Sequence, residues 1–243
     1  MCTLTWRTTP AGYGIYFNRD EKRARAEAEP PAARQRGGIR WLAPRDPGGG
    51  GTWIFANEYG VCACLLNYYE AAGTAGPSTG SRSRGLLMDD LAVSESVAVL
   101  AAAVDAAALA PYGPFWLAVF ERGRAQPRVR RWNGERLETP VVTGPPLTTS
   151  SYESEAVAAA RGARFRELVG GNDPPAALAA YHRDIDTNDP ARSVCMSRAD
   201  ARTVSFTRVE VDAREVRMAY APRMGDNRFA AETVCTLPVR KPA

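Results

Sequence analysis

The chain opens with MCTLTWRTTPAGYGIYFNRDE, residues 1–21, in which two strand-like segments flank a Pro-Ala-Gly turn. Residues 3–7 and 13–17 contain β-branched and aromatic side chains that favour strands, and the proline and glycine between them favour a turn. In an antiparallel hairpin of this kind the numbers of opposed residues sum to about 21 to 24, which places Cys2 opposite the segment 19–21. The stretch therefore predicts a hairpin that brings a thiol and several charged side chains to one end of a sheet.

Cys2 has the chemistry of a nucleophile that carries its own base. Cysteine is small enough for Met1 to be removed, and the processed chain would then begin with a thiol and a free α-amine on one residue. The reference pKa is about 7.7 to 8.0 for an α-amine and about 8.5 for a thiol, so the amine can accept the thiol proton near neutral pH. A neighbouring Arg19 would favour the thiolate, and Asp20 or Glu21 could hold the resulting ammonium in place.

The same residues allow a structural interpretation. For catalysis, the side-chain amide of an asparagine such as Asn67, with a backbone N–H, would stabilise the oxyanion that forms when the thiolate attacks a carbonyl. Alternatively, Cys2 is an ordinary strand residue, Met1 is retained, and residues 18–21 form a solvated turn. Spacing alone slightly favours this second interpretation.

Length and charge limit the classes of function. With 243 residues, of which 45% are hydrophobic, the chain can bury a substantial core, and we expect a single domain over residues 1–243. The net charge of +4 is modest and the arginines are spread along the chain, which argues against a nucleic-acid-binding surface. We therefore expect no nucleic-acid partner.

The sequence also bears on localisation. Threonines and Arg7 interrupt the N-terminal segment, which predicts that it is not a secretory signal. The longest apolar stretch, VAVLAAAVDAAALA, is short and contains Asp105, so no transmembrane segment is expected. Five cysteines without close metal-type spacing favour reduced thiols, and we expect a cytoplasmic protein.

The rest of the chain predicts an α+β order of strands, helix, strands, helices and strands. Residues 22–52 are rich in Arg, Pro and Gly and predict a long surface excursion. Asp89 and Asp90 are expected just before the first helix, as solvated charges. We expect two strands within 52–70 about a turn at 57–60, a helix from Ser94 to Leu109, strands at 115–121 and 128–138, helices at 154–169 and 175–185, and strands at 193–197, 203–211, 215–221 and 233–238.

Signals for metal or phosphate binding are weak. His182 is the only histidine, which excludes a multi-histidine metal site, and on its amphipathic helix we expect a surface or cap-packing role. Cys62 and Cys64 share a strand face with Leu66, where two buried thiols are favoured over a metal half-site. The four glycines at 48–51 lack the Lys-Ser/Thr that a phosphate-binding loop requires.

Several ordered motifs together resemble a known family. MCTLTW, YFNRDE, PRDPGGGGTWIFANEYGVCACLLN and SVCMSRADARTVSFT are similar to segments of the NRDE family, also called the transport and Golgi organisation protein 2 family, and they run over most of the chain. The resemblance implies the four-layer αββα sandwich of N-terminal nucleophile hydrolases, which agrees with the α+β order. It extends more distantly to cysteine amidases such as penicillin V acylase and conjugated bile acid hydrolase.

The resemblance to the amidases implies a set of catalytic residues. Cys2 matches the nucleophile, Arg19 the arginine just after the first hairpin, and Asn67 the oxyanion-side asparagine. Asp20 matches the acidic partner, although its offset from Arg19 differs from the amidase pattern. Arg198 matches the downstream arginine.

Two positions depart from the family pattern. Ser150 and Ser151 stand where family members often have an asparagine, and Ser197 stands where bacterial members have a histidine. Because a hydroxyl is a poor replacement for an amide donor, the first departure bears on catalytic competence.

The resemblance is consistent with two functions. In the first, which the residue chemistry slightly favours, Cys2 hydrolyses an amide or ester, or transfers its acyl group, without a cofactor. In the second, implied by the family's reported links to haem trafficking and to lipid or acyl-CoA homeostasis, the sandwich is a non-catalytic carrier in which Cys2 or His182 could ligate haem. The expected partner is thus a small acyl or hydrophobic ligand, or haem. Five aromatic residues are candidates either for the pocket of this ligand or for the hydrophobic core: Trp41, Trp53, Tyr68, Tyr69 and Trp116.

Overall fold

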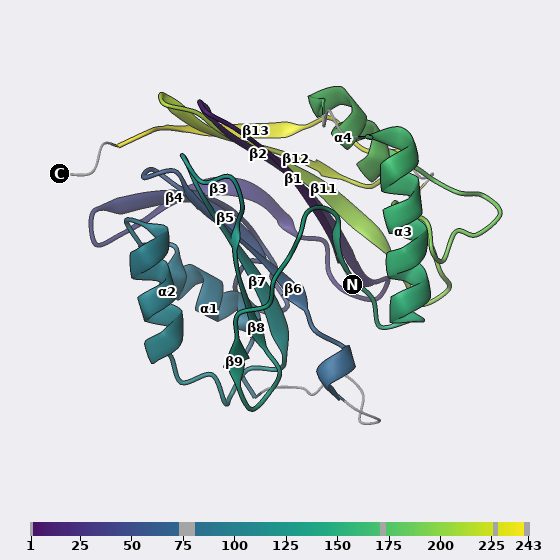
Figure 1. Cartoon of the computed structure of the whole chain (residues 1–243), viewed down its shortest axis with the longest axis horizontal. Helices are drawn as coiled ribbons and strands as arrows, with labels where there is room; N and C mark the ends of the chain where they lie inside the picture. The colour runs from purple at the N-terminus through teal and green to yellow at the C-terminus, as the bar shows by residue number, and fades with distance from the viewer. Residues whose placement is uncertain (1, 73–80, 171–173, 226–227, 241–243) are drawn as a thin grey trace.

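The computed structural model describes residues 2–72, 81–170, 174–225 and 228–240, and these residues form four layers (Figure 1). Two antiparallel sheets face each other in the middle. The outer layers are the helix pairs α1 (Arg84–Leu91) with α2 (Val97–Ala106), and α3 (Ser154–Leu168) with α4 (Pro175–Arg183). The chain therefore has the predicted α+β, αββα architecture of the N-terminal nucleophile hydrolase type.

The two sheets differ in the spatial order of their strands. The first sheet has the spatial order β10 (Leu147–Thr149), β1 (Cys2–Thr9), β2 (Gly12–Lys22), β11 (Ala201–Val211), β12 (Glu215–Pro222), β13 (Thr233–Pro238). The second sheet follows chain order: β3 (Glu29–Arg36), β4 (Ile39–Arg45), β5 (Ile54–Asn57), β6 (Val61–Asn67), β7 (Phe115–Glu121), β8 (Arg128–Trp132), β9 (Leu137–Glu138). A 3-10 turn at Glu70–Ala72 follows β6. The first sheet thus joins strands from both ends of the chain, with the N-terminal hairpin between β10 and β11.

Apolar side chains fill the spaces between the layers. Strand β6 shows how the sequence achieves this, because its alternate residues point to opposite faces. Cys62 and Cys64 pack in the core between the sheets, whereas Ala63 and Leu65 pack against α1 and α2. The two thiols are buried and free, as expected from the strand pattern.

The N-terminal hairpin presents a polar face to the other helix pair. The Oγ1 of Thr5 lies 2.8 Å from Nε2 of His182, and the side-chain amide of Asn18 donates to the carbonyl oxygen of His182 at 2.8 Å. His182 is fully buried, so a surface position for it is wrong. Burial, followed by the charge of Arg161, lowers the pKa of His182 to about 3. The histidine is therefore a neutral packing group that holds α4 to the first sheet.

Several predicted elements are confirmed and others are not. The expected hairpins in 52–70 and 128–138 and the helices near 154–169 and 175–185 are present. The segment 22–52 is not a surface excursion, because it contains the hairpin of β3 and β4. Residues 193–197 form no strand, and an isolated bridge joins Ser197 to Arg202 instead.

The region around the first helix pair also differs from expectation. The N-cap of α2 is Ser96 and not Ser94, since the Ser96 side chain accepts a hydrogen bond from the backbone N–H of Val99. Asp89 and Asp90 do not precede the first helix but lie within α1. None of the described helices combines the length and the apolar composition needed to cross a membrane.

Candidate active site

Cys2 lies at the end of the first sheet, where its strand is paired on both sides. Its partners in the ladders are Arg19 on β2 and Thr149 on β10, so the predicted opposition of Cys2 and Arg19 is confirmed. The residue is 7% exposed and lines a cavity of about 600 Å³. Asp20 and Asn67 line the same cavity. The hairpin and the end of β6 thus bring together residues that are far apart in sequence.

The surroundings of Cys2 keep its thiol protonated. Burial raises the pKa of the Cys2 thiol, and the charge of Asp20 raises it further. The positive charge of the N-terminus, a hydrogen bond from the Asp20 backbone and the charge of Arg19 act in the opposite direction but do not cancel the effect. A neutral thiol in this position needs a base at the moment of attack.

Arg19 is held in place by side chains from both halves of the sandwich. Its guanidinium carbon lies 4.3 Å from the centre of the Trp53 ring, in a cation–π arrangement. Its Nη2 lies 3.4 Å from a Glu21 carboxylate oxygen and 3.5 Å from an Asp46 carboxylate oxygen. Arg25 binds the same Asp46 carboxylate. The arginine opposite Cys2 is therefore fixed from both sheets.

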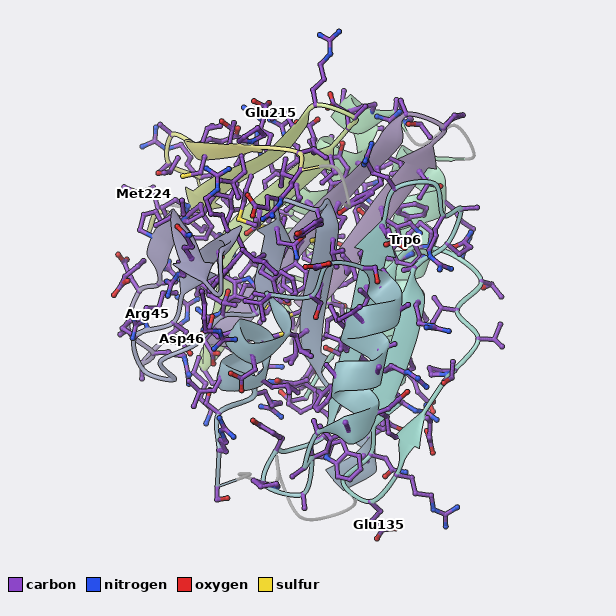
Figure 2. All side chains as sticks on the ribbon, turned by 90° about the vertical axis from the view of Figure 1, so that its left-hand side faces the viewer. Trp6, Arg45, Asp46, Glu135, Glu215 and Met224 are labelled. Atoms are coloured by element: carbon purple, nitrogen blue, oxygen red, sulfur yellow. The ribbon has the colours of Figure 1, made fainter. Side chains whose placement is uncertain are left out.

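The glycine-rich loop after β4 supplies Asp46 to this cluster. Figure 2 shows Asp46 directly after Arg45 at the end of the strand. The Asp46 backbone N–H donates to the carbonyl oxygen of Gly51 at 2.9 Å, which closes the loop. A Cβ at Gly51 would lie 2.1 Å from the backbone of Gly85, so glycine is required there. The loop consequently packs against the start of α1 and fixes it beside the cavity.

Asp20 belongs to a buried network on the helix side of the first sheet. Its Oδ2 lies 3.1 Å from Nη1 of Arg161 on α3, and its Oδ1 accepts from the Thr203 hydroxyl at 2.6 Å. The same Arg161 nitrogen donates to Oγ1 of Thr3 at 2.5 Å. Both charged side chains are essentially inaccessible to solvent. This network attaches α3 to the two strands that carry Cys2 and Arg19.

Asn67 and Arg198 complete the set of predicted residues at the cavity wall. The Asn67 side-chain amide donates to the Tyr69 hydroxyl at 2.8 Å. Arg198 binds Asp200 at 2.8 Å and lies over the Tyr152 ring, 5.0 Å from its centre. All five predicted site residues therefore line one cavity, although Arg198 is committed to an ion pair.

The serines that replace the expected asparagine directly follow Thr149, the residue of β10 that pairs with Cys2. Ser151 lines the cavity, whereas Ser150 is buried behind it. The Ser150 hydroxyl donates to the Tyr152 carbonyl oxygen at 2.6 Å and accepts from the Tyr152 N–H at 3.1 Å. Its hydroxyl thus stabilises the turn that follows β10.

Sequence reasoning did not single out three charged residues of this region: Asp46, Arg84 and Arg161. Arg84 begins α1 and lines the cavity. For Arg161 a signal was available, because Val157, Arg161 and Phe165 are spaced four residues apart and share the buried face of α3. An arginine at the centre of an apolar helix face requires a buried acidic partner. Within the described residues, no three His, Cys, Asp or Glu side chains are grouped to hold a metal ion.

Two solved structures share this architecture. An N-acylethanolamine-hydrolyzing acid amidase ortholog from Caenorhabditis elegans has a TM-score of 0.58 and 10% sequence identity, over 86% of this chain and 92% of that one. The C2A mutant of conjugated bile acid hydrolase from Clostridium perfringens has a TM-score of 0.52 and 12% identity, over 98% of this chain and 92% of that one. At such low identity the likeness establishes the N-terminal nucleophile hydrolase fold alone.

The sequence comparisons give the family. No curated protein matches the chain significantly. The Transport and Golgi organisation 2 family model matches residues 1–141, a segment that includes the N-terminal hairpin, the glycine-rich loop and the strand ending at Asn67. The chain therefore belongs to the Transport and Golgi organisation 2 family.

Proposed function

We propose that the protein is an N-terminal cysteine hydrolase that cleaves amide or ester bonds of small acyl compounds, with Cys2 as nucleophile after removal of Met1. The observation that carries this proposal is the position of Cys2 at the wall of a cavity shared with Arg19, Asp20 and Asn67. The amidase and hydrolase activities named for the two similar structures belong to the same reaction class. No cofactor is needed for this chemistry.

The proposed reaction begins with proton transfer within Cys2. The α-amine takes the proton from the thiol as the sulfur attacks the carbonyl carbon, which solves the problem of a thiol whose pKa is raised by burial. The negative charge moves to the carbonyl oxygen in a tetrahedral intermediate. Arg19, 6% exposed and fixed by Trp53, stabilises negative charge on the sulfur before attack.

The oxyanion requires hydrogen-bond donors in the cavity. The Asn67 amide has two N–H groups, and one of them already donates to the Tyr69 hydroxyl. The other N–H, together with a backbone N–H, donates to the oxyanion in the proposed mechanism. Collapse of the intermediate breaks the C–N or C–O bond, and the departing amine or alcohol takes the proton from the α-ammonium. A water molecule then hydrolyses the thioester, which releases the acid and restores the thiol.

Intact-mass spectrometry tests this proposal directly. The purified protein should be lighter than the full sequence by one methionine, and incubation with 4-nitrophenyl esters and anilides of graded chain length should add an acyl group that maps to Cys2 and turns over. Cys2→Ala should take up no acyl group. Cys235→Ser is the matched control, because Cys235 is half-buried on β13 and lies outside the cavity, so this variant should acylate normally. Retention of Met1, or equal acylation of Cys2→Ala, would refute the proposal.

The second candidate is a carrier that uses the same cavity for a hydrophobic anion such as haem or an acyl-CoA. The observation in its favour is the mixed lining, in which Trp53 and Tyr69 lie among arginines. His182 is buried against the first sheet and is not among the residues that line the cavity, so Cys2 is the haem ligand that this candidate would use. Stoichiometric haem should then shift its Soret band with the wild type and not with Cys2→Ala.

A further inference from the structure

The charges that line the cavity do not balance. The cationic residues of its lining are Arg19, Lys22, Arg25, Arg82, Arg84 and Arg198, and the acidic ones are Asp20, Glu21, Asp46 and Asp200. Most of the cations have an acidic partner. Arg19 and Arg25 share Glu21 and Asp46, and Arg198 binds Asp200. Arg82 is paired outside the cavity with Asp90, at 3.6 Å. The acid Asp20 is in turn occupied by Arg161.

Arg84 differs from the other arginines of the cavity. Its Nη1 donates to the carbonyl oxygen of Pro114 at 3.0 Å. Among the residues that the structure describes, no carboxylate lies within ion-pair distance of it. Burial lowers the pKa of the Arg84 guanidinium, while the charge of Glu21 favours its charged form. A partly desolvated guanidinium without an acidic partner is an unfavourable arrangement that a bound anion would relieve.

The backbone holds Arg84 at the cavity wall in a defined position. Residues 83–85 all line the cavity. The N–H of Thr52 donates to the carbonyl oxygen of Gly85 at 3.2 Å, and the close contact of Gly51 with Gly85 leaves no space for a side chain at either position. Because the backbone at the start of α1 is packed against the glycine-rich loop and Nη1 already donates to the Pro114 carbonyl oxygen, the guanidinium is ordered before a ligand binds, which lowers the entropic cost of binding.

Building on the proposed function, we infer that Arg84 binds a negatively charged group, a carboxylate, sulfonate or phosphate, carried by the molecule whose acyl carbon Cys2 attacks. The guanidinium is suited to this role because it keeps its charge when partly buried and donates in a fixed planar geometry. The substrates would then be anionic acyl compounds, and neutral amides or esters of the same size would bind more weakly. Arg84 is thus a specificity-determining residue of the cavity.

Two matched pairs of compounds test the inference and locate the charge. N-octanoylglycine and N-octanoylglycinamide differ by one negative charge on the departing amine. Glutaric acid monoanilide and glutaramic acid anilide, its primary amide, differ by one negative charge on the acyl side. We expect the wild type to prefer the anionic member of one pair, and Arg84→Gln to raise KM for that member about 10- to 100-fold with little change for the neutral one. Arg84→Lys should retain part of the preference.

The control is Arg128→Gln, which removes the same charge from an exposed position on β8 outside the cavity. This variant should keep both the activity and the preference. Equal effects of Arg84→Gln on the charged and neutral members, or no preference in the wild type, would overturn the inference.

Calorimetric titration of Cys2→Ala with the same pairs separates this inference from the proposed function. If no compound acylates Cys2 but the anionic member binds more tightly in an Arg84-dependent way, the hydrolase proposal fails and the anion site stands. If Cys2 acylates and neither member is preferred, the proposed function stands and the anion site fails.

Discussion

Replacing Arg161 by methionine should destabilise the protein more than any substitution of a surface arginine. The side chains of Arg161 and Asp20 are 1% and 0% exposed, so their interaction is not screened by solvent. The substitution removes the ion pair at 3.1 Å, the hydrogen bond to Thr3 at 2.5 Å, and the contact of Nε with the Arg192 carbonyl oxygen at 3.4 Å. It leaves the Asp20 carboxylate buried without its cationic partner, while its Oδ1 still accepts from the Thr203 hydroxyl.

The expected loss in the free energy of unfolding is about 3–5 kcal/mol, the cost of leaving one charge of a buried pair without its partner. For a chain of this length each kcal/mol lowers Tm by about 2–4 °C, so Tm should fall by roughly 6–20 °C. Urea unfolding at pH 7, followed by circular dichroism, measures the free energy, and calorimetry measures Tm.

Arg164→Met is the matched control on the same helix. Arg164 binds Asp184 and Glu167 at the surface, and its side chain is 36% exposed. Removing it should cost about 0–1 kcal/mol. The double variant Arg161→Met with Asp20→Asn should lose less than the sum of the two single losses, because the two groups interact directly. A loss near 1 kcal/mol for Arg161→Met, or additive losses in the double variant, would refute the view that this pair fixes α3 to the sheet.

Three further predictions concern titration and packing. The pKa of His182 is about 3 in the folded protein and about 6.5 in the unfolded chain, so the unfolded chain takes up a proton first as the pH falls. The free energy of unfolding should therefore decrease by about 1.4 kcal/mol per pH unit between pH 6.5 and 3. Urea unfolding between pH 4 and 7 should show that this part of the slope is lost in His182→Gln, and an unchanged slope would contradict the prediction. Because burial raises the pKa of the Cys2 thiol, iodoacetamide should alkylate Cys2 at pH 7 more slowly than it alkylates free cysteine. The rate should increase as the pH rises. A rate at pH 7 above that of free cysteine would argue against a protonated thiol. Gly51→Ala should lower the free energy of unfolding in urea by about 1–3 kcal/mol, because its Cβ would meet the backbone of Gly85. Gly48→Ala is the control and should be nearly neutral, because its Cβ would lie 3.6 Å from the nearest atom. Equal losses in the two variants would show that the contact with Gly85 is not what requires glycine.

The N-terminal hairpin could be predicted from sequence because all the information for it is local. The turn residues, the alternation and the register lie within residues 2–22, and the pairing of Cys2 with Arg19 follows from them. The hairpin of β3 and β4 could not be found in this way. Strand β3 has two consecutive prolines and mostly exposed side chains, so its local pattern resembles a loop. Its pairing with β4, and its contacts with β13 near the other end of the chain, decide its structure.

The candidate site shows the same division between local and long-range information. Asn67 and Cys2 could be assigned to one site only through a resemblance, because no local pattern connects β1 with the end of β6. The role of Arg161 could not be predicted from local sequence, because its partner Asp20 is 141 positions away. Its position on the apolar face of α3 is nevertheless unusual for a charged residue. Buried charges on predicted helix faces are therefore useful starting points when such a site is sought from sequence.

The alternation of side chains along β2 explains how one short hairpin can serve both steps of the proposed reaction. Arg19 points to the second sheet, where Trp53 and Asp46 hold it, and Asp20 points to the helix side, where Arg161 holds it. The Cys2 thiol lies on the same face as Arg19, since directly opposed residues share a face.

An α-amine at the start of β1 lies in the plane of the sheet and not on either face, so it is within reach of groups from both. The hairpin thus allows Arg19 to act on the thiol while Asp20 acts on the ammonium, and Arg161 becomes a positioning residue for the second of these roles. If so, Arg161→Lys should lower the pKa of the α-amine and slow acylation of Cys2 more at high pH, where the amine is already the free base, than at low pH, where the lower pKa restores part of the free base. A uniform decrease would indicate that Arg161 serves stability alone.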